Sequence, residues 1–170
     1  MREMVQACLQ DIFNMNSIKT FTTHSPEETI QLAAKLSKKL DTGDFVALIG
    51  ELGAGKTVFV KGLAKGLGLE SYKYVNSPAF VLMREYHGKK NLYHFDVYRL
   101  EEKDFCDTLD YETYFYGDGI TVVEWADKIE DILPDEYLKI NIKHIDVTDR
   151  EFGFTAKGER FKKLIAGIHN

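Results

Sequence analysis

The sequence contains little cysteine, and its two cysteines show no metal-binding pattern. Cys8 and Cys106 lack the paired spacing of a metal site, so free thiols in a reducing compartment are the simplest interpretation. The chain also lacks an apolar run long enough to span a membrane. Residues 1–14 include Glu3 and Asp11 and have no signal-peptide core. These absences predict a cytoplasmic protein with no membrane association.

An excess of positive charge is absent as well. The chain has 22 Lys and Arg against 27 Asp and Glu, a formal net charge of −5. This balance argues against a protein that binds nucleic acid on its own, because such proteins usually present a basic surface. The length of 170 residues suits one domain with a real core.

The most informative stretch runs from Gly50 to Thr57 and reads GELGAGKT. It fits the phosphate-binding pattern G-x-x-x-x-G-K-[ST] at every fixed position. Residues 44–49 before it form an apolar, β-type run, and residues 57–67 after it have helical periodicity. A strand, a glycine loop and a helix are the context that this motif requires.

The residue types of this loop suit a bound nucleotide. Glycines let successive backbone N–H groups turn toward phosphate oxygens, and the following helix adds the positive end of its dipole. Lys56 can reach the β- and γ-phosphates, and the Thr57 hydroxyl can coordinate Mg²⁺. The residues expected to bind ATP are Glu51, Leu52, Gly53, Ala54, Gly55, Lys56 and Thr57.

The rest of the chain predicts an α/β fold. We expect strands at 18–22, 80–87, 91–97, 119–124, 137–143 and 152–156, and helices at 26–40 and 160–168. Residues 101–118 are acidic and aromatic, typical of a solvated helix with one packed aromatic face, or of a partner surface. Gly88-Lys89-Lys90 predicts an antiparallel hairpin. The expected architecture is a three-layer sandwich of the P-loop NTPase type, with a mixed, mainly parallel sheet and one antiparallel hairpin.

Residues 17–170 are expected to form a single P-loop ATPase domain, with residues 1–16 as an N-terminal extension. Two interpretations of residues 1–14 stay open. Their apolar side chains repeat at helical spacing, which favours a docked helix, while Met15 offers an alternative start of the chain.

Two carboxylates are candidates for the metal and for catalysis. Glu124 ends a mostly apolar, β-branched strand that suits the centre of a sheet, and Asp96 ends a strand expected nearer the edge. Either could hold Mg²⁺ directly or through water, and Glu124 could instead orient the attacking water as a general base. Arg99 could stabilise charge on the transferred phosphoryl group or pair with a carboxylate.

Two missing signatures bear on which nucleotide the chain binds and on which class of enzyme it belongs to. The chain has no [NT]-K-x-D guanine signature, which favours ATP over GTP. It has only five arginines and no arginine-rich lid, which weakens the case for a small-molecule kinase. Residues 76–80 are well placed in the sequence to act as a nucleotide-sensitive loop.

Four segments together resemble the TsaE family, also called YjeE, the bacterial ATPases of tRNA threonylcarbamoyladenosine synthesis. They are GELGAGKT at 50–57, NSPAF at 76–80, HFDVYRL at 94–100 and VEWA at 123–126. The phosphate loop alone is unspecific, but the ordered set is specific. The resemblance covers roughly residues 17–156.

The resemblance implies slow hydrolysis of Mg-ATP that supports TsaD, with TsaB, in modifying the adenosine beside the tRNA anticodon. The chain would meet tRNA only through these partners, which agrees with its acidic charge. By motif match, Lys56 would hold phosphates, Thr57 and Glu124 would serve Mg²⁺, and Asp96 would be an essential acid near the metal. Glu124, Asp96 and Lys56 are thus the expected catalytic residues.

The resemblance also implies a functional role for Trp125 and a switch-like role for the Ser77-Pro78 loop. The chain departs from the family at Ala79, where the usual residue is threonine. We therefore assign no nucleotide-sensing role to residue 79, although Ser77 could substitute for the missing hydroxyl. Two other hypotheses stay open. One is a small-molecule kinase on the same fold, and the other is a non-catalytic binding module in which bound ATP only sets the shape of the protein.

Overall fold

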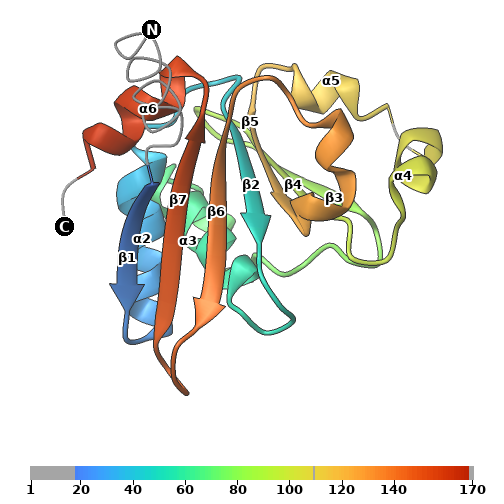
Figure 1. Ribbon diagram of the computed structural model, residues 1–170. Coiled ribbons are helices and arrows are strands. Elements are labelled where there is room, and N and C mark those ends of the chain that lie inside the picture. Colours follow the sequence, from blue (N-terminus) through green and yellow to red (C-terminus); the bar gives the residue numbers. More distant parts are fainter. Residues whose placement is uncertain (1–17, 109, 169–170) are drawn as a thin grey trace, which may run out of the picture.

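The computed structural model describes residues 18–108 and 110–168, which are organised around a seven-stranded sheet (Figure 1). The strand order is β1-β7-β6-β2-β5-β4-β3. The strands are β1 (Ile18–Thr23), β2 (Phe45–Ile49), β3 (Met83–Tyr86), β4 (Leu92–Asp96), β5 (Ile120–Glu124), β6 (Tyr137–His144) and β7 (Arg150–Lys157).

The sheet is mixed, as the sequence predicts. Parallel pairings join β6, β2, β5 and β4 in the centre. Antiparallel pairings add β7 and β1 at one edge and β3 at the other. The predicted β3–β4 hairpin is therefore confirmed, and β5 lies centrally while β4 lies next to the edge strand. Burial of β2 and β5 on both faces explains why they are nearly continuous apolar runs, whereas β4, also buried, includes His94 and Asp96.

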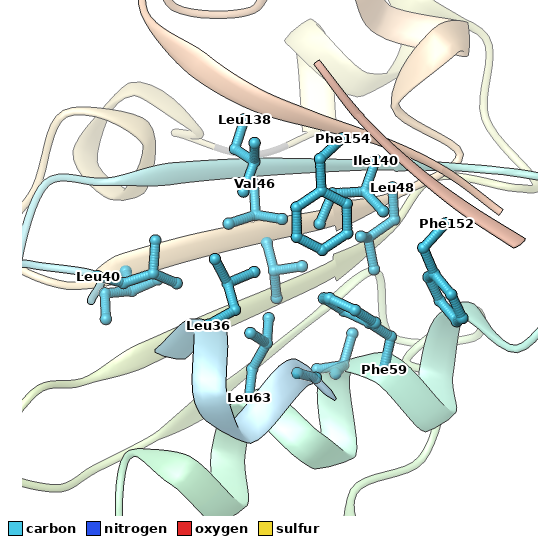
Figure 2. Close-up of a cluster of buried hydrophobic side chains, with 14 of the residues drawn as sticks. Leu36, Leu40, Val46, Leu48, Phe59, Leu63, Leu138, Ile140, Phe152 and Phe154 are labelled. Carbon is cyan, nitrogen blue, oxygen red and sulfur yellow. The ribbon is translucent and has the colours of Figure 1, made fainter. Parts of the chain in front are cut away.

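Helices cover the sheet from both sides. They are α2 (Pro26–Ser37), α3 (Lys56–Gly66), α4 (Glu102–Thr108), α5 (Glu112–Phe115) and α6 (Glu159–Ala166), with 3-10 helices η1 (Glu70–Tyr74) and η2 (Ala126–Ile132). One apolar cluster joins α2, α3 and α6 to one sheet face. Figure 2 labels its side chains from α2, α3 and the strands, among them Leu36, Phe59 and Phe154. The second cluster joins α4, α5 and η2 to the other face. Along β2, for example, side chains alternate between the two clusters: Phe45 and Ala47 belong to the second, and Val46 and Leu48 to the first.

The helix α2 begins as the sequence predicts. The Ser25 side chain accepts a hydrogen bond from the Glu28 backbone N–H, and Pro26 occupies the first helical position. The helix ends at Ser37, three residues before the predicted end at Leu40, although Leu40 remains fully buried. The chain turns at this point because the N–H groups of Lys39 and Leu40 bond to carbonyls only three residues back.

Three local predictions differ from the structure. The acidic and aromatic segment forms two short helices rather than one, and it packs Phe105 and Phe115 into the core. The strand expected from residue 80 begins at Met83, because the N–H groups of Val81 and Leu82 bond to the Pro78 carbonyl in a turn. The 3-10 helices η1 and η2 were not predicted.

In the part of the chain that the structure describes, no helix is long and apolar enough to cross a bilayer. Both interpretations of residues 1–14, and the extension at 1–16, concern positions outside the described residues.

Candidate functional site

The glycine loop lies between the end of β2 and the start of α3. Its backbone takes conformations that favour glycine, with φ of +77° at Gly53 and +105° at Gly55, the N-cap of α3. No side chain caps this end of the helix. The loop therefore leaves a helix N-terminus available to an anionic group, as phosphate binding requires.

Lys56 is the first residue of α3, and its side chain folds back over the loop. Its ammonium group donates to the carbonyls of Gly50 at 2.6 Å and Glu51 at 2.9 Å. It also lies 3.6 Å from the centre of the Trp125 ring. Burial lowers the pKa of Lys56, and the nearby carboxylates of Glu124, Asp96 and Asp127 partly oppose this effect. A buried ammonium group held by neutral acceptors is well prepared to pair with an anion.

Strand alternation brings the two candidate carboxylates together. Asp96 of β4 and Glu124 of β5 are register partners, and both project from the sheet face that α3 covers. The Thr57 hydroxyl donates to Glu124 Oε1 at 2.8 Å and lies 3.1 Å from Oε2. Because its proton points at Glu124, the lone pairs of the Thr57 oxygen remain available to a cation.

Asp96 ties the loop at residues 76–80 to the same place. Ser77 donates its hydroxyl to Asp96 Oδ2, and the Tyr98 backbone N–H donates to Oδ1 at 3.0 Å. The Ser77 oxygen also accepts from the Ala79 N–H at 3.2 Å. Ser77 thus supplies a hydroxyl beside the carboxylate, two residues before the alanine that departs from the family pattern.

These groups share one pocket of about 270 Å³. Its lining consists of Leu52, Gly53, Ala54, Gly55, Lys56, Thr57, Val58, Ser77, Asp96, Glu124 and Trp125. All three expected catalytic residues line it, as do all the expected ATP-binding residues except Glu51, whose carbonyl binds Lys56 instead. Trp125 has the left-handed φ of +63° and packs on Tyr98 at 4.8 Å between ring centres. Arg99 does not line the pocket; its guanidinium lies 4.1 Å from the centre of the Phe80 ring.

Two further residues, His94 and Arg150, contact groups of the site. His94 is fully buried and bonds Glu124 Oε1 through Nε2 at 2.8 Å. Its position two residues before Asp96 on one strand was a usable signal, because such residues share a face. Arg150 at the start of β7 donates to the Ala54 carbonyl of the glycine loop at 3.2 Å. No local pattern indicates that contact, which depends on the β6–β7 connection lying beside the loop.

The donor set fits Mg²⁺ in the presence of a nucleotide. Among residues 18–108 and 110–168, no cluster of three or more His, Cys, Asp or Glu side chains could hold a metal by itself. The site offers two carboxylates and one hydroxyl beside a phosphate-binding loop. Mg²⁺ is commonly bound in this manner, through one or two carboxylates, waters and substrate phosphates.

Comparison with known proteins identifies the family of this chain. The family model described as "Threonylcarbamoyl adenosine biosynthesis protein TsaE" matches residues 23–152. The chain belongs to the TsaE family. The TsaE protein of Bacillus subtilis strain 168 is 46% identical over 143 residues, which cover 84% of this chain and 88% of that protein. The TsaE protein of Haemophilus influenzae is 32% identical over 161 residues, 90% of this chain and 100% of that protein.

A solved structure confirms the fold. The crystal structure of Bacillus subtilis YdiB superposes with a TM-score of 0.75 at 40% identity, and the match covers 89% of this chain and 94% of that one. The predicted α/β class with a mixed sheet therefore holds for this TsaE-family chain, both in its own strand order and by likeness to a solved relative.

Proposed function

We propose that this TsaE-family chain is a P-loop ATPase that binds Mg-ATP and hydrolyses it slowly to ADP and phosphate. The hydrolysis supports the TsaD–TsaB complex in the threonylcarbamoyl modification of the adenosine next to the tRNA anticodon. Residues 17–170 act as one ATPase domain in the cytoplasm. The family match and the Walker-type loop are the grounds for this proposal.

One observation carries the ATPase assignment. The hydroxyl of Thr57, directly after the loop lysine, donates to Glu124, a buried carboxylate at the end of the neighbouring parallel strand. P-loop NTPases hold Mg²⁺ with this pair of groups, a loop Ser or Thr and an acid at a strand end. The contact joins residues far apart in sequence, and a chance glycine-rich turn would not require it.

In this proposal the loop residues Glu51 to Thr57 bind the phosphates. The backbone N–H groups and the N-terminus of α3 contribute partial positive charge. Lys56 exchanges its bonds to the Gly50 and Glu51 carbonyls for bonds to phosphate oxygens. Because the ammonium group is buried, its attraction to the phosphates is screened less than at a surface.

Thr57 and Glu124 would hold Mg²⁺, and bound Mg²⁺ would neutralise charge that develops on the β- and γ-phosphate oxygens. Glu124 acts either as a ligand, directly or through water, or as the group that orients the attacking water. Asp96 is the second acid, and its bond to Ser77 couples the loop at 76–80 to the site. A loop connected in this manner suits a switch that partners read.

The test is phosphate release from Mg-ATP by the purified chain, alone and with TsaD and TsaB. We expect slow turnover that rises with the partners. Lys56→Ala should abolish ATP binding or turnover, while Glu124→Ala should retain ATP binding and lose about 100-fold or more in turnover. Glu101→Ala, at an exposed carboxylate outside the pocket, is the matched control and should keep wild-type turnover.

Each alternative has its own signature in this assay. Normal hydrolysis by folded Glu124→Ala would refute the role of that residue. Phosphate transfer from ATP to a metabolite rather than to water would replace the proposal with a small-molecule kinase. ATP binding with no turnover under any condition, including with both partners, would identify a binding module.

A further inference from the structure

The imidazole of His94 is fully buried next to the candidate site, yet none of the roles above uses it. His94 and Asp96 project from the same face of β4, and Glu124 projects from that face of β5. Glu124 is the register partner of Asp96, so His94, two register positions earlier on β4, lies diagonally across from Glu124. The Nε2–Oε1 distance is 2.8 Å. A carboxylate can only accept, so the proton in this bond belongs to Nε2.

The second ring nitrogen, Nδ1, makes histidine an energetically costly residue at this position. Within the described residues, His94 Nδ1 is buried and has no hydrogen-bond partner. A buried polar atom without a partner reduces stability, and an apolar ring of similar size would avoid that cost. The imidazole also packs on Tyr86, at 6.5 Å between ring centres, but a phenyl ring can make that contact equally well. Only the bond to Glu124 requires a nitrogen donor.

Glu124 is held from two elements at once. Thr57 donates to it from α3, and His94 donates to it from β4. Among the described residues, removing His94 would leave the carboxylate with a single side-chain donor, Thr57, at the start of α3 beside the phosphate loop. Two donors on different elements fix the carboxylate plane, whereas one donor lets it rotate.

We infer that His94 is a positioning residue: its Nε2–H fixes the Glu124 carboxylate in the orientation that faces Thr57 and the pocket. This inference rests on the proposed ATPase function, and it gives the buried histidine a role in turnover rather than in folding.

The test compares two substitutions at residue 94. His94→Phe keeps a packed ring and removes the donor, and His94→Gln keeps an N–H at about the reach of Nε2. We expect His94→Phe to lower kcat by about 10- to 100-fold, with KM for ATP changed by less than about threefold, because the phosphate loop stays intact. His94→Gln should recover to within about fivefold of wild type. Tyr86→Phe is the control and should retain wild-type kcat.

Stability separates positioning from a structural role. His94→Phe should keep or raise the thermal midpoint, because it removes an unpartnered nitrogen while activity falls. Wild-type kcat in folded His94→Phe overturns the inference. If His94→Phe does not fold, the exchange rate of the His94 Nε2–H in wild type and in Glu124→Ala decides, and a loss in folded His94→Gln as large as that of Glu124→Ala overturns the inference.

A second measurement does not depend on activity and is made without nucleotide or metal. In protein labelled with ¹⁵N-histidine, the Nε2–H of His94 should give a slowly exchanging resonance. Glu124→Ala should accelerate its exchange, and Tyr86→Phe should not. Unchanged exchange in Glu124→Ala overturns the inference. If the wild-type chain fails to hydrolyse ATP, the proposed function fails, and this resonance still decides whether His94 holds Glu124.

Discussion

Replacing Gly62 by alanine is expected to destabilise the protein, although alanine is the better helix former. Gly62 lies inside α3 where that helix packs on α2. A Cβ at this position would lie 2.6 Å from both the Ala33 Cβ and the Ile30 carbonyl oxygen, and 2.9 Å from the Ile30 Cα. Carbon atoms in ordinary contact are about 3.5–4.0 Å apart, so the two helices would have to separate by about 1 Å.

The magnitude is the difference between two opposing effects. Overpacking a close helix contact costs about 1–3 kcal/mol, and the upper part of that range, about 2–3 kcal/mol, applies here because the obstacle includes backbone atoms that cannot rotate away. The better intrinsic helix propensity of alanine returns about 1 kcal/mol. We therefore expect the free energy of unfolding to fall by about 1–2 kcal/mol. Because α3 carries Lys56 at its first turn, weaker ATP binding should accompany this loss.

Urea unfolding followed by far-UV circular dichroism measures this effect. With a slope of about 2 kcal/mol/M, the midpoint should fall by about 0.5–1 M while the slope stays constant. Lys65→Gly, at an exposed position of the same helix, calibrates the propensity effect and should cost about 1 kcal/mol. A Gly62→Ala protein that is more stable than wild type would refute the reasoning, since it would mean that α2 and α3 separate at no cost.

Other substitutions test separate parts of the structure. Thr57→Val removes the hydroxyl that donates a hydrogen bond to Glu124. Titration calorimetry should show that the Mg²⁺-dependent increase in ATP affinity falls by about 10- to 100-fold. Leu63→Ala in the buried core should lower the free energy of unfolding by about 2–5 kcal/mol in urea melts. The bond and charge of Asp149 raise the pKa of His24 above 6.5. The resulting stabilisation is complete below that value and is lost as pH rises through the raised pKa, so the stability advantage of wild type over His24→Gln should shrink as the pH of the urea melts rises above about 6.5.

Much of the fold could be predicted because its elements have strong local signals. The start of α2 was predictable from Ser25 and Pro26, which supply a cap and a fixed φ. The strand β5 was predictable as a central strand because five consecutive buried residues produce an apolar, β-branched run. These signals depend on residues adjacent in sequence, which is why the structure reproduces them.

The elements that were missed depend on contacts that are distant in sequence. The segment after Glu101 contains helical periodicity, but the packing of Phe105 and Phe115 against β4 breaks it into two short helices. One difference has a local cause instead: the strand predicted from residue 80 starts late, at Met83, because of the turn at Pro78, where Leu82 takes a positive φ of +68°. Single-sequence patterns favour extended backbone for the aromatic Phe80 and the β-branched Val81, and the turn overrides that preference.

The candidate site combines both kinds of information. The spacing of His94 and Asp96 shows from sequence alone that they share one face of a strand, because side chains alternate with a period of two. It does not show which face, nor what lies opposite. The parallel register that pairs Asp96 with Glu124 supplies the missing fact, and a slip of one residue would move one of the two carboxylates to the other side of the sheet. Sequence could therefore name the acids, while only the register shows that Thr57 and His94 both reach Glu124, the arrangement on which the metal and positioning proposals depend.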